Sequence, residues 1–177
     1  MPIVYFILSI LFFMPSVANA GPHENIQQLS FLTVNNDYHI NGVRVYFHGR
    51  YQEDEKTFSS VAINSIGLLP SFFPTASECK TLEVHVYEIP RTVLNDRDVM
   101  SFLDWSSWNN QNILGTYDSI ASNRGTASIF LTRDRGKNVF SDTIVHELVH
   151  FWQDSHCMPV IETPAIEFES YYKKRFN

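Results

Sequence analysis

One short segment of the sequence carries the residue types that metal-dependent hydrolysis requires. It reads His146-Glu147-Leu148-Val149-His150. Residues four apart in a helix lie on one face, so the two imidazoles can bind the same metal ion. A bound zinc ion lowers the pKa of water, and a neighbouring carboxylate can take the proton as the water attacks a carbonyl. The segment therefore predicts a site with one zinc ion, two histidine ligands and Glu147 as the general base.

The residues around this segment favour a buried helix. Ser141 is a suitable N-cap, and Asp142 places a negative charge in the first turn, where the helix dipole stabilises it. The apolar positions that follow are Ile144, Val145, Leu148, Val149 and Phe151. We expect this apolar surface to pack against the core while the two histidines meet at the metal ion.

The chain resembles the HExxH zinc metallopeptidases, and in particular the gluzincin-like members, whose third ligand is a glutamate on the next helix. The resemblance covers about the last 40 residues. It implies that His146 and His150 are ligands and that Glu147 is the general base. The longer motif of the metzincins is absent, because His156 falls at the wrong spacing and no glycine marks the turn. His156 is expected to be a loop histidine.

Three glutamates are candidates for the third ligand. Glu162, Glu167 and Glu169 lie 12, 17 and 19 residues after His150. Glu162 is followed three residues later by Ala165, which resembles the Glu-x-x-Ala signature of several gluzincin-like families. Glu167 fits a longer spacing, similar to that of thermolysin-type enzymes. Glu162 is the favoured ligand, and the other two stay open as alternatives.

The positions of these glutamates require a helix hairpin. Cys157-Met158-Pro159 predicts a break after the first helix, and helical character resumes over residues 162–176. Asp154 could orient the second ring nitrogen of His150, although an ordinary helix-end carboxylate is the favoured interpretation. Tyr171 and Tyr172 could donate to a developing oxyanion, but packing is the favoured role for both.

The elements before the metal-binding helix predict a small α+β domain with a short mixed sheet packed on helices. Strand character appears over residues 43–47, 82–88, 113–117 and 127–132, and helical spacing over 58–69, closed by Pro70, and 97–108. The resemblance implies a zincin-like single domain. It also implies that the strand at 128–131 is an edge strand along which an extended peptide could lie.

Residues 1–20 have the pattern of a secretory signal peptide. An apolar stretch from Ile3 to Met14 is followed by Val17-Ala18-Asn19-Ala20, which has the small residues that a signal peptidase reads. The stretch is too short to span a bilayer, which takes about 20 residues. We therefore expect cleavage after Ala20, a mature domain over 21–177 that is not inserted in the membrane, and a secreted or periplasmic location.

Cysteine content and charge agree with this prediction. Cys79 and Cys157 are the only two cysteines, so one disulfide is expected, with two buried thiols as the alternative. The net charge is −6, and no basic run is longer than Lys173-Lys174-Arg175. Nucleic acid is excluded as a partner, because binding it requires a concentrated positive surface.

Together these features predict an exported zinc metallopeptidase that acts on a peptide or protein substrate. Two alternatives belong to other classes. One is a non-catalytic zinc-binding interaction module, and the other is a zinc amidase that acts on cell-wall material. Exchange of Glu147 for glutamine separates the first alternative from an enzyme, because only an enzyme would lose an activity.

Overall fold

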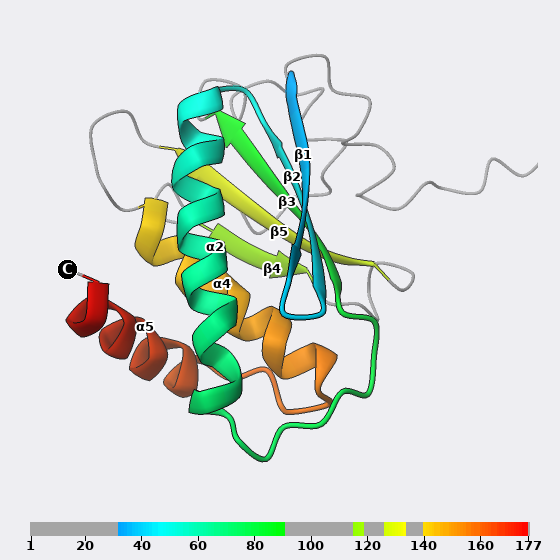
Figure 1. The fold of residues 1–177 in the computed structure, drawn as a ribbon, viewed down its shortest axis with the longest axis vertical. Helices are drawn as coiled ribbons and strands as arrows, with labels where there is room; N and C mark the ends of the chain where they lie inside the picture. Colours follow the sequence, from blue (N-terminus) through cyan, green and yellow to red (C-terminus); the bar gives the residue numbers. More distant parts are fainter. Residues whose placement is uncertain (1–31, 91–114, 119–125, 134–139, 177) are drawn as a thin grey trace, which may run out of the picture.

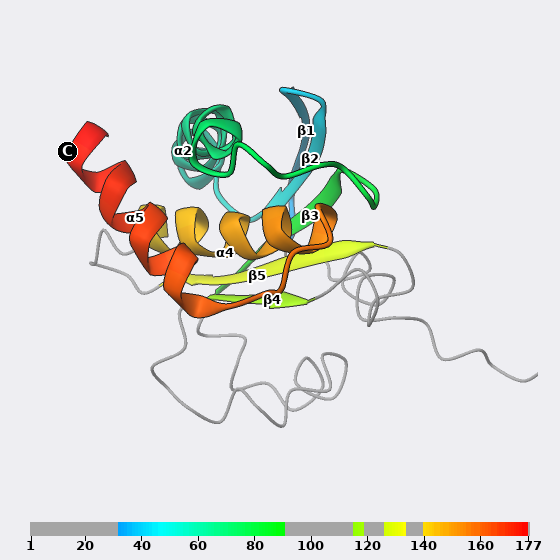
Figure 2. The ribbon, with the colours of Figure 1, turned by 90° about the horizontal axis from the view of Figure 1, so that it is seen from below.

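A computed structural model describes residues 32–90, 115–118, 126–133 and 140–176. The expected leader over 1–20 and the expected helix over 97–108 lie outside these residues. Within the described part, a five-stranded mixed sheet has two helices packed on one face, and a third helix packs on one of these two (Figure 1). The view in Figure 2 shows α2 (Gln52–Phe72) and α4 (Phe140–Ser155) on the same side of the strands, with α5 (Glu162–Phe176) beside α4. The α+β class predicted from the sequence is confirmed.

The strand order in the sheet is β1, β2, β3, β5, β4. β1 (Val34–Ile40) and β2 (Val43–Gly49) form an antiparallel hairpin. Its two-residue turn, Asn41-Gly42, has positive φ at both positions (49° and 83°), as a type I′ turn requires. β3 (Glu83–Pro90) and β5 (Ala127–Arg133) continue the sheet in parallel, and β4 (Gly115–Asp118) closes it in the antiparallel direction.

The prediction that residues 128–131 form an edge strand was wrong. These residues belong to β5, which lies between β3 and β4. Among the described residues, the outermost strand on this side is β4, in which Thr116 pairs with Phe130 of β5. β4 has only four residues. A strand this short carries too little periodicity to indicate which side of a neighbour it will occupy.

Helix α2 (Gln52–Phe72) connects β2 to β3 and extends past the position where the sequence predicted its end. Pro70 lies inside its last turn rather than closing it. Proline removes one backbone donor, but the helix ends nearby, and Phe73 N–H still donates to Leu69 O at 2.8 Å.

None of the helices in the described ranges combines the length and the apolar character that a membrane span requires.

Helices α4 (Phe140–Ser155) and α5 (Glu162–Phe176) form the predicted hairpin and lie next to each other in both views (Figures 1 and 2). α4 begins two residues earlier than expected, so Ser141 lies in its first turn and is not the N-cap. α4 packs on β5 and β4 with its apolar face. The core side chains from these elements include Ile129, Leu131, Val145, Leu148, Val149, Trp152, Ala165 and Phe168.

Candidate metal centre

The two histidines of α4 face each other across one helical turn. Their ring centroids are 4.8 Å apart with an interplanar angle of 83°, and the two Nε2 atoms are 3.1 Å apart. The side chain of His150 is 7% exposed and that of His146 is 20% exposed. The two rings converge because residues four apart lie on the same face of a helix. The buried apolar residues of α4 hold this helix against the sheet.

Glu162, the first residue of α5, completes a group of three. Its Oε2 lies 3.0 Å from His146 Nε2 and its Oε1 lies 3.4 Å from His150 Nε2. Its side chain is 71% exposed, so the group opens to solvent on this side. Of the three glutamates considered from the sequence, the structure brings Glu162 to the histidines. Glu167 is exposed elsewhere on α5. Glu169 lies near the other nitrogen of the His146 ring, Nδ1.

A tight helix ending brings Glu162 back within so few residues. Cys157 has a φ of 55°, Cys157 N–H donates to Asp154 O, and Met158 N–H donates to Gln153 O at 2.7 Å. This pair of bonds, together with a left-handed residue, is the Schellman motif that reverses a chain at a helix C-terminus. The next helix therefore begins beside the last turn of α4.

The second nitrogen of each imidazole faces an oxygen. His150 Nδ1 lies 3.2 Å from Gln153 Oε1, and His146 Nδ1 lies 3.6 Å from Glu169 Oε2. Oxygens of this kind accept hydrogen, so neutral rings with a hydrogen on Nδ1 present bare lone pairs at Nε2. Burial lowers the pKa of His150, which favours its neutral form. With their hydrogens on Nδ1, the two rings would each offer a lone pair at Nε2, beside a carboxylate oxygen of Glu162.

Such a set of acceptors fits a cation. Ligands at about 2.0–2.1 Å in a tetrahedral zinc site lie about 3.3–3.4 Å from one another. The three measured separations in this group run from 3.0 to 3.4 Å. Two imidazoles and one carboxylate also match the donor set of catalytic zinc sites, which leave one position for water or substrate. The residues present therefore fit a single zinc ion.

Glu147 lies next to this group but does not belong to it. It is 6% exposed, and burial raises the pKa of its carboxyl to about 8, with a further contribution from the negative charge of Glu162. The backbone of Gly115 in β4 lies close to Glu147. A Cβ atom at position 115 would lie only 2.9 Å from Glu147 Oε1 and 2.4 Å from Thr143 Cγ2. A nearby cation would favour the carboxylate form that a general base needs.

The remaining side chains singled out in the sequence lie away from the ligands. Asp154 accepts a 2.6 Å hydrogen bond from the Tyr117 hydroxyl and pairs with Lys80. Tyr172 is buried, and its ring lies 4.7 Å from that of the exposed Phe176. The ring of His156 stacks on Trp152 at 4.0 Å, and its Nδ1 lies 2.8 Å from Trp152 O.

Tyr171 also lies in a packing contact, with its ring 5.8 Å from that of Phe72.

The sequence interpretation missed Gln153 as the partner of His150. A signal was present, because Gln153 follows His150 by three residues and shares its helix face.

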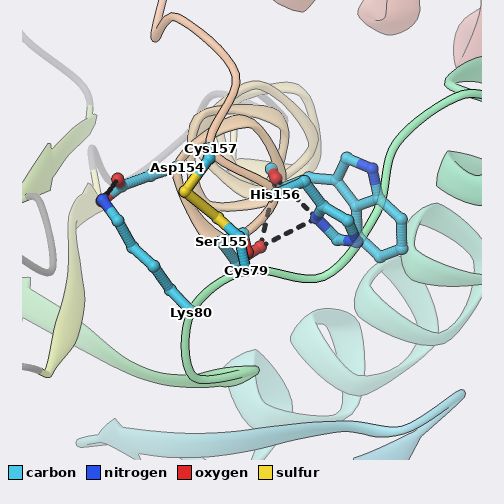
Figure 3. Close-up of a disulfide and its surroundings, with 7 residues drawn as sticks. Cys79, Lys80, Asp154, Ser155, His156 and Cys157 are labelled. Carbon is cyan, nitrogen blue, oxygen red and sulfur yellow. Dashed lines mark hydrogen bonds and ion pairs between the residues drawn. A yellow bond between two sulfur atoms is a disulfide. The ribbon is translucent and has the colours of Figure 1, made fainter.

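The predicted disulfide between Cys79 and Cys157 is present and lies at the C-terminal end of α4 (Figure 3). Its two Cα atoms are 5.9 Å apart. The N–H groups of Cys79 and Lys80 both donate to Ser155 O, at 3.1 and 3.0 Å. The segment before β3 is therefore also hydrogen-bonded to the end of α4. These contacts attach the turn that precedes Glu162 to the rest of the domain.

No protein-family model matches this chain, and no curated protein matches it with significance.

Proposed function

We propose that this protein is an exported zinc metallopeptidase. The observation that carries the proposal is the convergence of two imidazole lone pairs and a carboxylate within 3.4 Å, beside the buried Glu147. Two nitrogens and one oxygen favour zinc over magnesium or calcium, which prefer oxygen ligands alone. His146, His150 and Glu162 would hold the ion.

The chemistry divides between the ion and the chain. Zinc bound to these three residues would lower the pKa of a water molecule and polarise a substrate carbonyl. Glu147 accepts the proton of the attacking water and delivers it to the leaving amine. The side chain of Glu147 is buried, so bulk water has little access to its carboxylate. The side chain of Glu162 is 71% exposed, so a substrate would approach the three residues from the Glu162 side.

The position of β4 supports a peptide substrate. Gly115 brings the backbone of this strand against Glu147, so a peptide extending alongside β4 would pass the general base. In the zincin-like architecture that the sequence resembles, a strand beside the metal-binding helix has this role. We assign this role to β4 rather than β5, because β5 lies between β3 and β4. Replacement of Gly115 by alanine should displace Glu147 and reduce cleavage, while the ligands on α4 and α5 keep zinc bound.

Export is part of the proposal for two reasons. The leader pattern at residues 1–20 is that of a secreted chain. A disulfide is present between Cys79 and Cys157, and disulfides persist mainly in oxidising compartments.

The test combines metal analysis with cleavage of a peptide mixture. The chain from Gly21 is purified, its zinc content is measured, and its products from the mixture are identified by mass spectrometry. We expect one zinc per chain and peptide cleavage, with Glu147→Gln keeping the zinc and losing at least about a hundredfold in turnover. Equal cleavage by the two proteins, or no zinc in the wild type, would overturn the proposal.

Two other outcomes point to the alternative functions. Zinc binding by the wild type without cleavage of any peptide would indicate an interaction module. Cleavage of glycan-linked peptides from cell-wall material, with linear peptides left intact, would indicate an amidase.

A further inference from the structure

Gln153 is a buried side chain that contacts the ligand-bearing segments of both α4 and α5. It is 1% exposed and lies one turn after His150. Its Oε1 is 3.2 Å from His150 Nδ1. The same amide reaches Ile161, the residue immediately before Glu162, by two hydrogen bonds.

These two bonds determine which end of the amide is oxygen. Ile161 N–H donates to Gln153 Oε1 at 3.2 Å, and Gln153 Nε2 donates to Ile161 O at 3.2 Å. If the amide were reversed, two donors would face each other at one end and two acceptors at the other. Because the backbone of Ile161 sets the amide orientation, the atom that faces His150 Nδ1 is an acceptor.

We propose that Gln153 is a positioning residue that sets the tautomer of His150 and ties that ring to the segment carrying Glu162. With an acceptor at Nδ1, the ring hydrogen stays on that nitrogen, and Nε2 keeps its lone pair for a cation shared with His146 and Glu162. The bonds to Ile161 act on the other ligand, since they satisfy both polar backbone groups of the residue before it. One amide thus aligns two ligands from two helices. The effect on metal binding rests on the proposed function, whereas the tautomer does not.

The substitutions that separate this role from simple packing are Gln153→Met and Gln153→Glu. Methionine has a similar length and no acceptor for His150 Nδ1–H. Glutamate keeps an oxygen at that position whether or not it is protonated. Ser155→Ala is the matched control, because it removes a buried side-chain hydrogen bond from the same helix, to Trp152 O, without touching the ligands.

The tautomer is read in the metal-free protein at about pH 8 from two-bond ¹⁵N–¹H couplings of the histidine rings. Zinc affinity is then measured by competition with a chelator. We expect His150 to carry its hydrogen on Nδ1 in the wild type, in Gln153→Glu and in Ser155→Ala. In Gln153→Met the hydrogen should move to Nε2, and zinc affinity should fall about tenfold to a hundredfold. Gln153→Glu keeps the acceptor for His150 but loses the donor to Ile161 O, so its zinc affinity should fall less than that of Gln153→Met.

Two results would overturn the inference. One is a wild-type His150 with its hydrogen on Nε2, and the other is a folded Gln153→Met protein that binds zinc as tightly as the wild type. Failure of the wild type to take up zinc would overturn the proposed function instead, and the tautomer would still test Gln153. If Gln153→Met does not fold, the wild-type and Gln153→Glu tautomers decide the question.

Discussion

The two halves of the candidate metal centre are built differently. His146 and His150 lie on one helix that is packed against the sheet, with side chains 20% and 7% exposed. Glu162 is 71% exposed and begins a second helix. Its place depends on the Schellman turn at Cys157, the disulfide and the amide of Gln153. The histidine pair is thus a product of local geometry, while the carboxylate needs contacts between distant segments.

The largest effect is expected from removal of a ligand in the buried half. His150→Ala should weaken zinc binding about a thousandfold, or by about 4 kcal/mol, because it leaves a single imidazole on α4. Competition with a chelator of known affinity measures this change. Retention of wild-type affinity would mean that the two histidines do not share an ion.

Loss of the disulfide should act on the other half. We expect Cys79→Ser with Cys157→Ser to lower the free energy of unfolding by about 3 kcal/mol, as for other small domains. The same variant should lose about tenfold in zinc affinity, because the turn before Glu162 is released while α4 keeps its histidines. Chemical denaturation gives the first value and chelator competition the second. An unchanged zinc affinity in the folded variant would show that the Gln153 contact alone holds Glu162.

The contribution of Glu162 itself is isolated by a matched pair on α5. Glu162→Ala should lower zinc affinity about a hundredfold, or about 2.7 kcal/mol, because it removes the only oxygen ligand among the three. Glu167→Ala removes the same charge from an exposed position of this helix and should leave affinity unchanged. Equal losses in the two variants would indicate a general effect of charge rather than a ligand.

The smallest effect is expected from the general base, measured in metal-free protein. Burial raises the pKa of Glu147 from 4.5 to about 8, so between these values the unfolded chain releases a proton that the folded chain retains. Stability therefore falls as pH rises through this range. Glu147→Gln removes this dependence and should be more stable than the wild type by about 1 to 2 kcal/mol at about pH 8, with no advantage at about pH 4. Urea denaturation at both pH values tests this, and an equal difference at both would contradict it.

The sequence predicted the parts of the fold that depend on near neighbours. The hydrophobic spacing in residues 58–69 and the alternation in 82–88 correspond to α2 and β3. The end of α2 was placed too early, because Pro70 lies in the last turn, where the loss of one backbone donor does not prevent the helix from reaching Phe72. The edge of the sheet was misassigned, because β4 is too short to reveal its partner.

The amino-acid sequence alone determined that two imidazoles and a carboxyl group share one segment of helix, since residues four apart meet wherever a helix forms. It also indicated Glu162, Glu167 and Glu169 as candidates for a third ligand. Tertiary structure decided that Glu162 meets the histidines, that Glu169 lies behind His146, and that Gln153 bonds to Ile161. The physical reason is that a chain reversal depends on contacts between segments far apart in the sequence, such as Cys79 with Cys157, and no local spacing specifies them.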